Sequence, residues 1–241
     1  MNDYTQSIRA DVDGPVRHYE YEDEAVIVAD FGSAEGSVDI VDRTAIIVVD
    51  DEQYELSVPA DVDRAVIVDW DVHPGNGTQE VFYDRDDVLV VSLHNDFGSW
   101  GPNHPQTNAL DERGEGDGTG YSVNVPLPPG TGDAGYERAF DRLVDPIVES
   151  FAPDLILVSA GQDPGQVDPQ ARNLVTKAGF ERLGERARTL AETAADGNLA
   201  LVQEGGYQQT HLAFATLGVL EGAIGYETGI DDPWDQLAEH E

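Results

Sequence analysis

One apolar run ends in a short cluster of side chains that could bind a metal ion. Residues 65–68 are followed by Asp69, Asp71 and His73 at alternate positions, and then by a proline and two glycines. Two carboxylates and an imidazole can hold a catalytic zinc ion and leave one coordination position open for water. Taken alone, the same three residues fit the capping of a turn equally well.

Three further apolar runs of the sequence also end in polar residues. The second run ends in Ser92, His94, Asn95 and Asp96, the third at Asp163 in SAGQD, and the fourth at Tyr207 in EGGY. Ligands bind outside the carboxyl ends of the strands in open parallel sheets, so these positions are expected to converge. Each residue alone has a plainer interpretation, and their occurrence at successive strand ends favours the functional one.

The chemistry that such a cluster predicts is amide hydrolysis. Zinc held by two aspartates and one histidine lowers the pKa of its bound water to about 7 and polarises a carbonyl. A tyrosine next to a glycine turn, such as Tyr207, can approach the ligand and donate its hydroxyl to an oxyanion. Taken singly, Asp163 fits a helix cap, Tyr207 a surface aromatic and His94 a core histidine. His104, His211 and His240 show no ligand pattern and are expected to be solvated.

The elements that would position these residues alternate between strands and helices from residue 64 onward. The expected strands lie at 65–70, 88–94, 121–127, 155–161 and 199–207, and several are nearly continuous apolar runs. Helices are expected at 134–151, 176–195 and 209–224, where apolar residues follow helical spacing. The pattern predicts an α/β fold with three layers and a mostly parallel sheet.

The first 61 residues follow a different pattern. Short β-branched runs within residues 24–58 are separated by acidic turns, which predicts a small antiparallel β meander. The junction is expected at residues 59–63. We therefore predict three parts, namely a β-rich segment over 1–61, an α/β domain over 62–226 and an acidic tail over 227–241.

The charge balance disfavours one class of partner. The 241 residues carry 48 acidic and 13 basic side chains, a formal net charge of −35, and Lys177 is the only lysine. A field this negative repels phosphate backbones and disfavours direct binding of nucleic acid. It is typical of a folded protein adapted to high salt, where self-repulsion is screened. No cysteine is present and no apolar run is long enough to span a membrane, so we expect a cytoplasmic protein.

Residues 64–225 resemble the histone deacetylase and acetylpolyamine amidohydrolase family, of the arginase-deacetylase superfamily. The resemblance is carried in order by VDWDVHPGNGTQ, VVSLH, GEGDGTGYSVNVPLPPGTGD, FAPDLILVSAGQDPGQVDP and LVQEGGY. It implies an arginase-deacetylase-like parallel sheet, here incomplete, with the site at the strand ends. It also implies removal of acetyl groups from acetyl-lysine or acetylpolyamines. The aspartate and histidine pattern and the tyrosine after EGG favour the zinc branch over the dimanganese arginase branch.

The resemblance assigns roles to individual residues. It implies zinc ligands at Asp71, His73 and Asp163, and an oxyanion-stabilising hydroxyl on Tyr207. It also implies a structural K⁺ site at Asp69, Ser92 and the Leu93 carbonyl. Trp100 matches the aromatic wall of the family's substrate tunnel.

The resemblance fails before residue 60. The family carries two adjacent histidines upstream of the Asp-x-Asp-x-His strand, which serve as general base and electrostatic partner, and this chain has no such pair. Three hypotheses follow: an active deacetylase with an unusual base, a non-catalytic metal-binding remnant, or an interaction module built on residues 1–60. An oligomer or a partner chain could cover the incomplete domain.

Overall fold

A computed structural model describes residues 62–96 and 107–234 in full, together with the backbones of five strands between residues 16 and 57. The five strands predicted after residue 64 are all present, and the fold class is confirmed. They are β6 (Ala65–Asp69), β7 (Val88–Asn95), β8 (Ser122–Leu127), β9 (Leu155–Ala160) and β10 (Leu199–Gln203).

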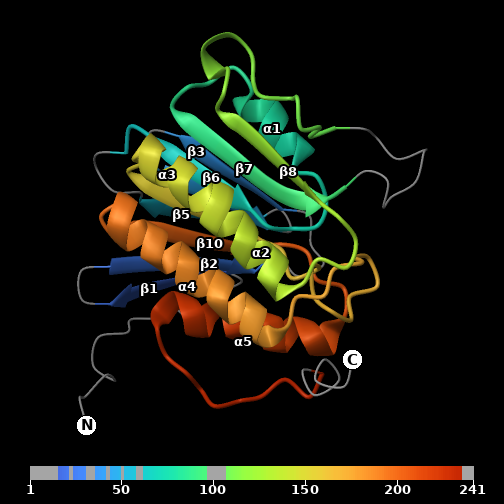
Figure 1. Cartoon of the computed structure of the whole chain (residues 1–241). Helices are drawn as coiled ribbons and strands as arrows, with labels where there is room; N and C mark the ends of the chain where they lie inside the picture. The colour runs from blue at the N-terminus through green and yellow to red at the C-terminus, as the bar shows by residue number, and fades with distance from the viewer. Residues whose placement is uncertain are drawn as a thin grey trace.

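These five strands form the parallel part of a larger sheet. Its order is β10-β9-β6-β7-β8, and every neighbouring pair within it is parallel, as Figure 1 shows. Because β6 lies between β9 and β7, its carboxyl end has the ends of both neighbours beside it. This order positions the residues that follow β6, β7 and β9 at one edge of the sheet.

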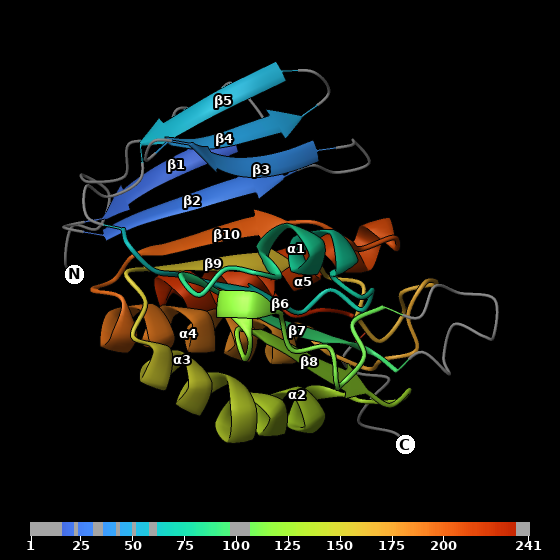
Figure 2. The same ribbon diagram turned by 90° about the horizontal axis from the view of Figure 1, so that it is seen from above.

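The helices divide between the two faces of the sheet. Figure 2 shows α2 (Asp133–Ala139), α3 (Asp145–Phe151) and α4 (Lys177–Ala194) on one side, and the short α1 (Asn76–Phe82) on the other. The side chains follow the same division. Val66 and Val68 of β6 pack into the large core with α4, whereas Ile67 packs with Phe82 of α1. Strand residues therefore alternate between two buried faces, which explains their continuous apolar runs.

The helix predicted over residues 134–151 is interrupted by one wider turn. A π-helical segment, η3 (Phe140–Val144), joins α2 to α3 and is followed by Pro146. Proline has no N–H to donate and its ring crowds the carbonyl four residues earlier, so the turn before it widens. Helix α1 was not predicted, because residues 76–82 are too few and too polar to show a helical period.

The last helix, α5 (Gln209–Ile224), packs along α4. Glycines allow this close approach: a Cβ atom on Gly184 of α4 would lie 2.2 Å from the Val219 carbonyl oxygen of α5. The buried pair of Lys177 and Glu221 joins the same two helices. The only lysine of the chain therefore serves as an internal ion-pair partner.

The strands before residue 58 belong to two sheets. β1 (Val16–Tyr21) and β2 (Glu24–Asp30) form a hairpin, and β2 adds to the large sheet parallel to β10. A separate antiparallel sheet contains three strands: β3 (Gly36–Val41), β4 (Thr44–Val49) and β5 (Glu52–Ser57). The antiparallel pairing agrees with the predicted meander, and the addition of the hairpin to β10 was not foreseen.

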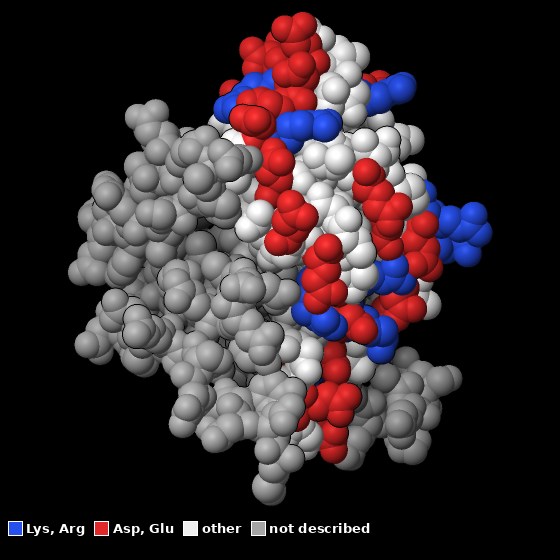
Figure 3. All heavy atoms as spheres, turned by 90° about the vertical axis from the view of Figure 1, so that its left-hand side faces the viewer, with Lys and Arg blue, Asp and Glu red and all other residues white. Residues whose placement is uncertain are grey.

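Charge is spread over the surface as the composition indicates. On the face drawn in Figure 3, acidic side chains run across the described part in several groups, and fewer basic side chains lie among them. Arg186 of α4, for example, bridges Asp141 and Asp145. Among the described residues, no helix is both long and apolar enough to cross a membrane.

Candidate metal centre

The turn after β6 is built from its own acidic side chains. The Asp71 backbone N–H donates to Asp69 Oδ1 at 3.0 Å, and the His73 N–H donates to Asp71 Oδ1 at 2.7 Å. Each carboxylate thus caps the residue two positions later, which is the turn-capping role considered from the sequence. That role does not exclude metal binding, because Asp71 keeps its second carboxylate oxygen for another partner.

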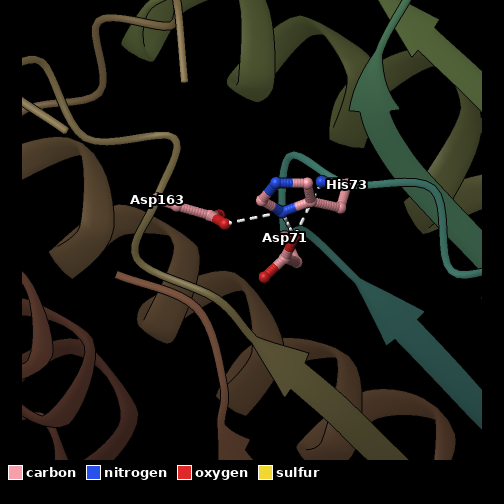
Figure 4. Close-up of side chains that lie close together, drawn as sticks. All are labelled: Asp71, His73 and Asp163. Atoms are coloured by element: carbon pink, nitrogen blue, oxygen red, sulfur yellow. Dashed lines mark hydrogen bonds and ion pairs between the residues drawn. The ribbon is translucent and has the colours of Figure 1, made fainter. Parts of the chain in front are cut away.

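Asp163 joins this turn from the loop after β9. It is fully buried, and its Oδ1 accepts the Val72 backbone N–H at 3.0 Å. The side chains of Asp71, His73 and Asp163 point toward one another (Figure 4). His73 Nδ1 lies 2.8 Å from Asp71 Oδ1 and 3.0 Å from Asp163 Oδ2. Residues 90 positions apart therefore meet because β6 and β9 are neighbouring parallel strands.

The donor set fits a divalent metal ion. One potential ligand atom from each of the three residues lies within 4.8 Å of the others, and among the described residues this is the one group of its kind. Two carboxylates and one imidazole are ligands that zinc accepts at a catalytic site. The resemblance assigned the same three residues, and the geometry brings all three together.

Glycines leave the space that the two carboxylates need. A Cβ atom on Gly205 would lie 2.3 Å from Asp71 Oδ2 and 2.4 Å from Asp163 Oδ2. A Cβ atom on Gly161 would lie 2.5 Å from Asp71 Oδ2. At Gly161 and Gly205, the loops after β9 and β10 therefore approach the two carboxylates without a side chain. A side chain at either position would displace the carboxylates.

The electrostatics of the cluster also call for a cation. Burial, followed by the charge of Asp71, raises the pKa of Asp163 well above its ordinary value. Burial disfavours the charged form of His73, but the hydrogen bonds and charges of Asp163 and Asp71 outweigh it and raise its pKa to about 10. Without metal, a proton on His73 offsets only one of the two carboxylate charges. A bound dication would offset both charges and leave the imidazole neutral, as a metal ligand must be.

Tyr207 lies beside this group. Its ring is edge-on to that of His73, with 6.1 Å between centroids, and it is 52% exposed. Its backbone N–H donates to Asp168 Oδ2 at 2.6 Å, so a carboxylate from the loop after β9 fixes the turn after β10. Partial burial and nearby carboxylates raise the pKa of the Tyr207 hydroxyl, which keeps it protonated as a donor. The positioning role of Asp168 was not foreseen in the sequence.

The predicted cation residues lie below the strand ends. Asp69 and Ser92 are buried, and a Cβ atom on Gly75 would lie 2.5 Å from Asp69 Oδ2 and 3.7 Å from Ser92 Oγ. Leu93 is fully buried beside Ser92. These positions agree with a shared site, and the potassium assignment stays a prediction. Trp100 lies outside the described residues.

Two histidines are placed by the structure. His94 is fully buried and its Nδ1 lies 3.0 Å from Ser92 Oγ, which confirms the core-histidine interpretation. The expectation that His211 is solvated was wrong. His211 is 1% exposed and pairs with Asp232, because α5 carries it into the space behind the Asp163 loop. An unpatterned histidine on an apolar helix gave no signal of this partner.

Comparison with known proteins identifies the family. Residues 53–223 match a family model described as the histone deacetylase domain. The chain belongs to the histone deacetylase family. Residues 1–70 match a second model, a family of unknown function named DUF7127, which agrees with the prediction that the N-terminal part is not deacetylase-like.

Relatives in this family include curated proteins and solved structures. Histone deacetylase 8 of Arabidopsis thaliana is 47% identical over 74% of this chain, and a probable deacetylase of Archaeoglobus fulgidus is 41% identical over 73%. The match covers 48% of each, so this family member spans about half the length of those relatives.

The solved structures agree with the fold. The HDA15 HD domain superposes with a TM-score of 0.64 at 37% identity, covering 74% of this chain and 48% of that one. An acetylpolyamine aminohydrolase from Burkholderia pseudomallei gives a TM-score of 0.60 at 37% identity, covering 67% and 45%.

Proposed function

We propose that this member of the histone deacetylase family is a zinc-dependent amidohydrolase that removes acetyl groups from acetyl-lysine or acetylpolyamines. The observation that carries the proposal is the meeting of Asp71, His73 and Asp163 at two neighbouring strand ends, with Tyr207 beside them. The family match supports the reaction class. The names of the relatives support an acetylated amine as the substrate class.

Each residue of the site has one role in this proposal. Asp71, His73 and Asp163 would hold the zinc ion. Bound there, zinc lowers the pKa of water and polarises the acetyl carbonyl. Tyr207 donates its hydroxyl hydrogen to the oxygen that becomes negative in the transition state, a contribution that is typically large. Asp168 holds the Tyr207 backbone in place for that hydrogen bond.

A monovalent cation fits the proposal below the zinc. The Asp69 carboxylate is buried, and burial together with nearby carboxylates raises its pKa well above the ordinary value. A K⁺ ion between Asp69, Ser92 and the Leu93 carbonyl would stabilise the ionised form. This cation would have a structural role, because zinc and Tyr207 would supply the chemistry at the acetyl group.

No residue of the site is assigned the role of general base in this proposal. Within residues 62–96 and 107–234, the histidines other than His73 are His94, buried against Ser92, and His211, paired with Asp232. A missing base typically costs about 10²–10⁴ in rate. We therefore expect slow turnover by this chain alone, with water acting as base or a partner chain supplying a histidine.

A direct assay tests the proposal. The purified chain is incubated with a fluorogenic acetyl-lysine peptide and with an acetylated polyamine in molar salt, before and after removal of zinc. Chelator-sensitive release of acetate that returns with added zinc is expected. Zinc binding without any release would instead favour a non-catalytic remnant, the alternative suggested by the absence of the family's histidine pair and by the unrelated N-terminal segment.

Co-expression separates these two outcomes further. If the upstream half of a full-length relative restores turnover to an inactive chain, the pocket is incomplete but chemically competent. If the isolated chain already works at the rate of a complete enzyme, the remnant interpretation is wrong.

A further inference from the structure

The segment after α5 returns along that helix and is tied to it at two points. We call residues 226–234 the C-terminal strap; Figure 1 shows it leaving the end of α5 and passing back beneath the helix. Near its start, the Thr228 backbone N–H donates to Glu221 Oε1 at 2.6 Å. Near its end, Asp232 Oδ2 lies 3.0 Å from His211 Nδ1. The deacetylase match ends at residue 223, so the strap lies outside it.

The second tie is a buried polar pair. His211 and Asp232 are each 1% exposed, and the remaining oxygen of Asp232 accepts the Trp234 backbone N–H at 2.9 Å. A carboxylate can only accept, so the hydrogen of the His211 ring lies on Nδ1. The pair therefore fixes both the tautomer and the orientation of the imidazole, as carboxylate partners of histidine commonly do.

The other edge of the His211 imidazole contacts the loop that carries Asp163. A Cβ atom on Gly165 would lie 2.3 Å from His211 Nε2 and 2.4 Å from Cδ2, so only glycine fits against the ring. Gly165 in turn holds the loop together. Its N–H donates to the Gln162 carbonyl at 3.1 Å, and its carbonyl accepts the Asp168 N–H at 3.0 Å.

These contacts form a closed circuit that includes the turn carrying Tyr207. Asp168 accepts the Tyr207 N–H, and the Gln208 side chain accepts the His211 N–H at 2.6 Å. The imidazole of His211 contacts Gly165, and the Gly165 carbonyl accepts the Asp168 N–H, which completes the circuit. A displacement of the imidazole would therefore move the Asp168 carboxylate, and with it the backbone of Tyr207.

We propose that His211 and Asp232 are positioning residues of the catalytic centre: the strap, through Asp232, holds the His211 ring against Gly165 and thereby fixes the loop that bears Asp163 and Asp168. The proposal rests on the function proposed above for the role of Tyr207. Its metal-related part does not depend on turnover, because Asp163 is a ligand candidate in either case.

Two variants separate positioning from simple attachment of the strap. His211→Asn keeps an amide donor near the position of Nδ1 for Asp232 but removes the ring that contacts Gly165. Thr228→Val removes the hydroxyl that bonds Glu221 at the opposite end of the strap and leaves the ring in place. Both are compared with the unmodified chain for thermal unfolding, for the visible absorption of bound Co²⁺, and for kcat and KM.

We expect His211→Asn to lower kcat about tenfold with KM nearly unchanged, the lower end of the effect of outer partners at metal sites. The Co²⁺ absorption should shift, because Asp163 is no longer held in one place. Thr228→Val should change neither kcat nor the Co²⁺ absorption, even where it lowers the unfolding temperature. Asp232→Ala should resemble His211→Asn, and Asp232→Asn, which retains an acceptor oxygen, should restore much of the lost rate.

The results discriminate between the two proposals. An unchanged Co²⁺ spectrum and kcat in His211→Asn would overturn the positioning role while leaving the deacetylase proposal standing. Equal losses in His211→Asn and Thr228→Val would also overturn it, since the strap would then act through stability alone. If the unmodified chain releases no acetate, even with the upstream half of a relative co-expressed, the deacetylase proposal fails, and the Co²⁺ spectrum still tests the positioning of Asp163.

Discussion

Gly205 offers a sharp test of the metal centre, because a side chain at this position would collide with both carboxylates. In a Gly205→Ala variant, the new Cβ would lie 2.3 Å from Asp71 Oδ2 and 2.4 Å from Asp163 Oδ2. Close carbon–oxygen contacts in proteins begin at about 3.3 Å, so each oxygen would have to retreat by roughly 1 Å. The contact is with two ligand candidates at once, and neither can move without losing its place at the metal.

The size of the effect follows from the tolerance of metal sites. Ligand distances vary by only about 0.2 Å around their preferred values, several times less than the displacement required here. Loss of an outer partner of a ligand typically costs 10–100-fold in affinity, and direct displacement should cost at least the upper value. We therefore expect the Kd for zinc to rise by about 100-fold, or about 2.7 kcal/mol.

The measurement is a zinc titration in competition with a chromophoric chelator, in molar salt. Gly77→Ala is the matched control, since a Cβ at Gly77 in α1 would meet no atom within 4 Å. Circular dichroism establishes that both variants are folded. If Gly205→Ala binds zinc as tightly as Gly77→Ala, Asp71 and Asp163 do not share a metal ion, and the proposed centre is wrong.

Three further predictions concern single side chains. Tyr207→Phe should retain stoichiometric zinc in a metal analysis but lose about 10²–10³ in kcat, because it removes only the oxyanion donor. The raised pKa of His73 adds stability to the metal-free protein that is fully present below pH 6.5 and lost as the pH rises through about 10, so its melting temperature should fall across that interval and His73→Phe should flatten the fall. Lys177→Ala should lower the free energy of unfolding in a urea titration by about 3 kcal/mol, because it leaves buried Glu221 unpaired, and Lys177→Arg should recover part of the loss.

The parallel sheet was predictable because its strands are buried on both faces. Val66, Ile67 and Val68 give a continuous apolar run that few other elements produce, and the helices between strands show a regular period. Helix α1 and the π-helical turn at 140–144 escaped prediction. One is short and polar, and the other depends on how a proline is accommodated within a continuous helix.

The ligand residues were predictable for a different reason. Asp71 and His73 are close in sequence, and Asp163 follows another apolar run, so the rule that parallel strands end at a common edge was sufficient. The partners that hold them in place were not. The bond from Asp168 to the Tyr207 backbone joins two loops 39 residues apart, and neither residue type indicates the other.

The amino-acid sequence determined the fold class and the donor set, because both follow from local patterns: continuous apolar runs that mark strands buried on both faces, and acidic or imidazole groups at the strand ends. Tertiary structure alone decided which backbone had to be glycine, where the β1–β2 hairpin pairs, and that His211 is buried against Asp232 rather than solvated. These features depend on distances between segments far apart in the chain, and such distances exist only once the layers have packed.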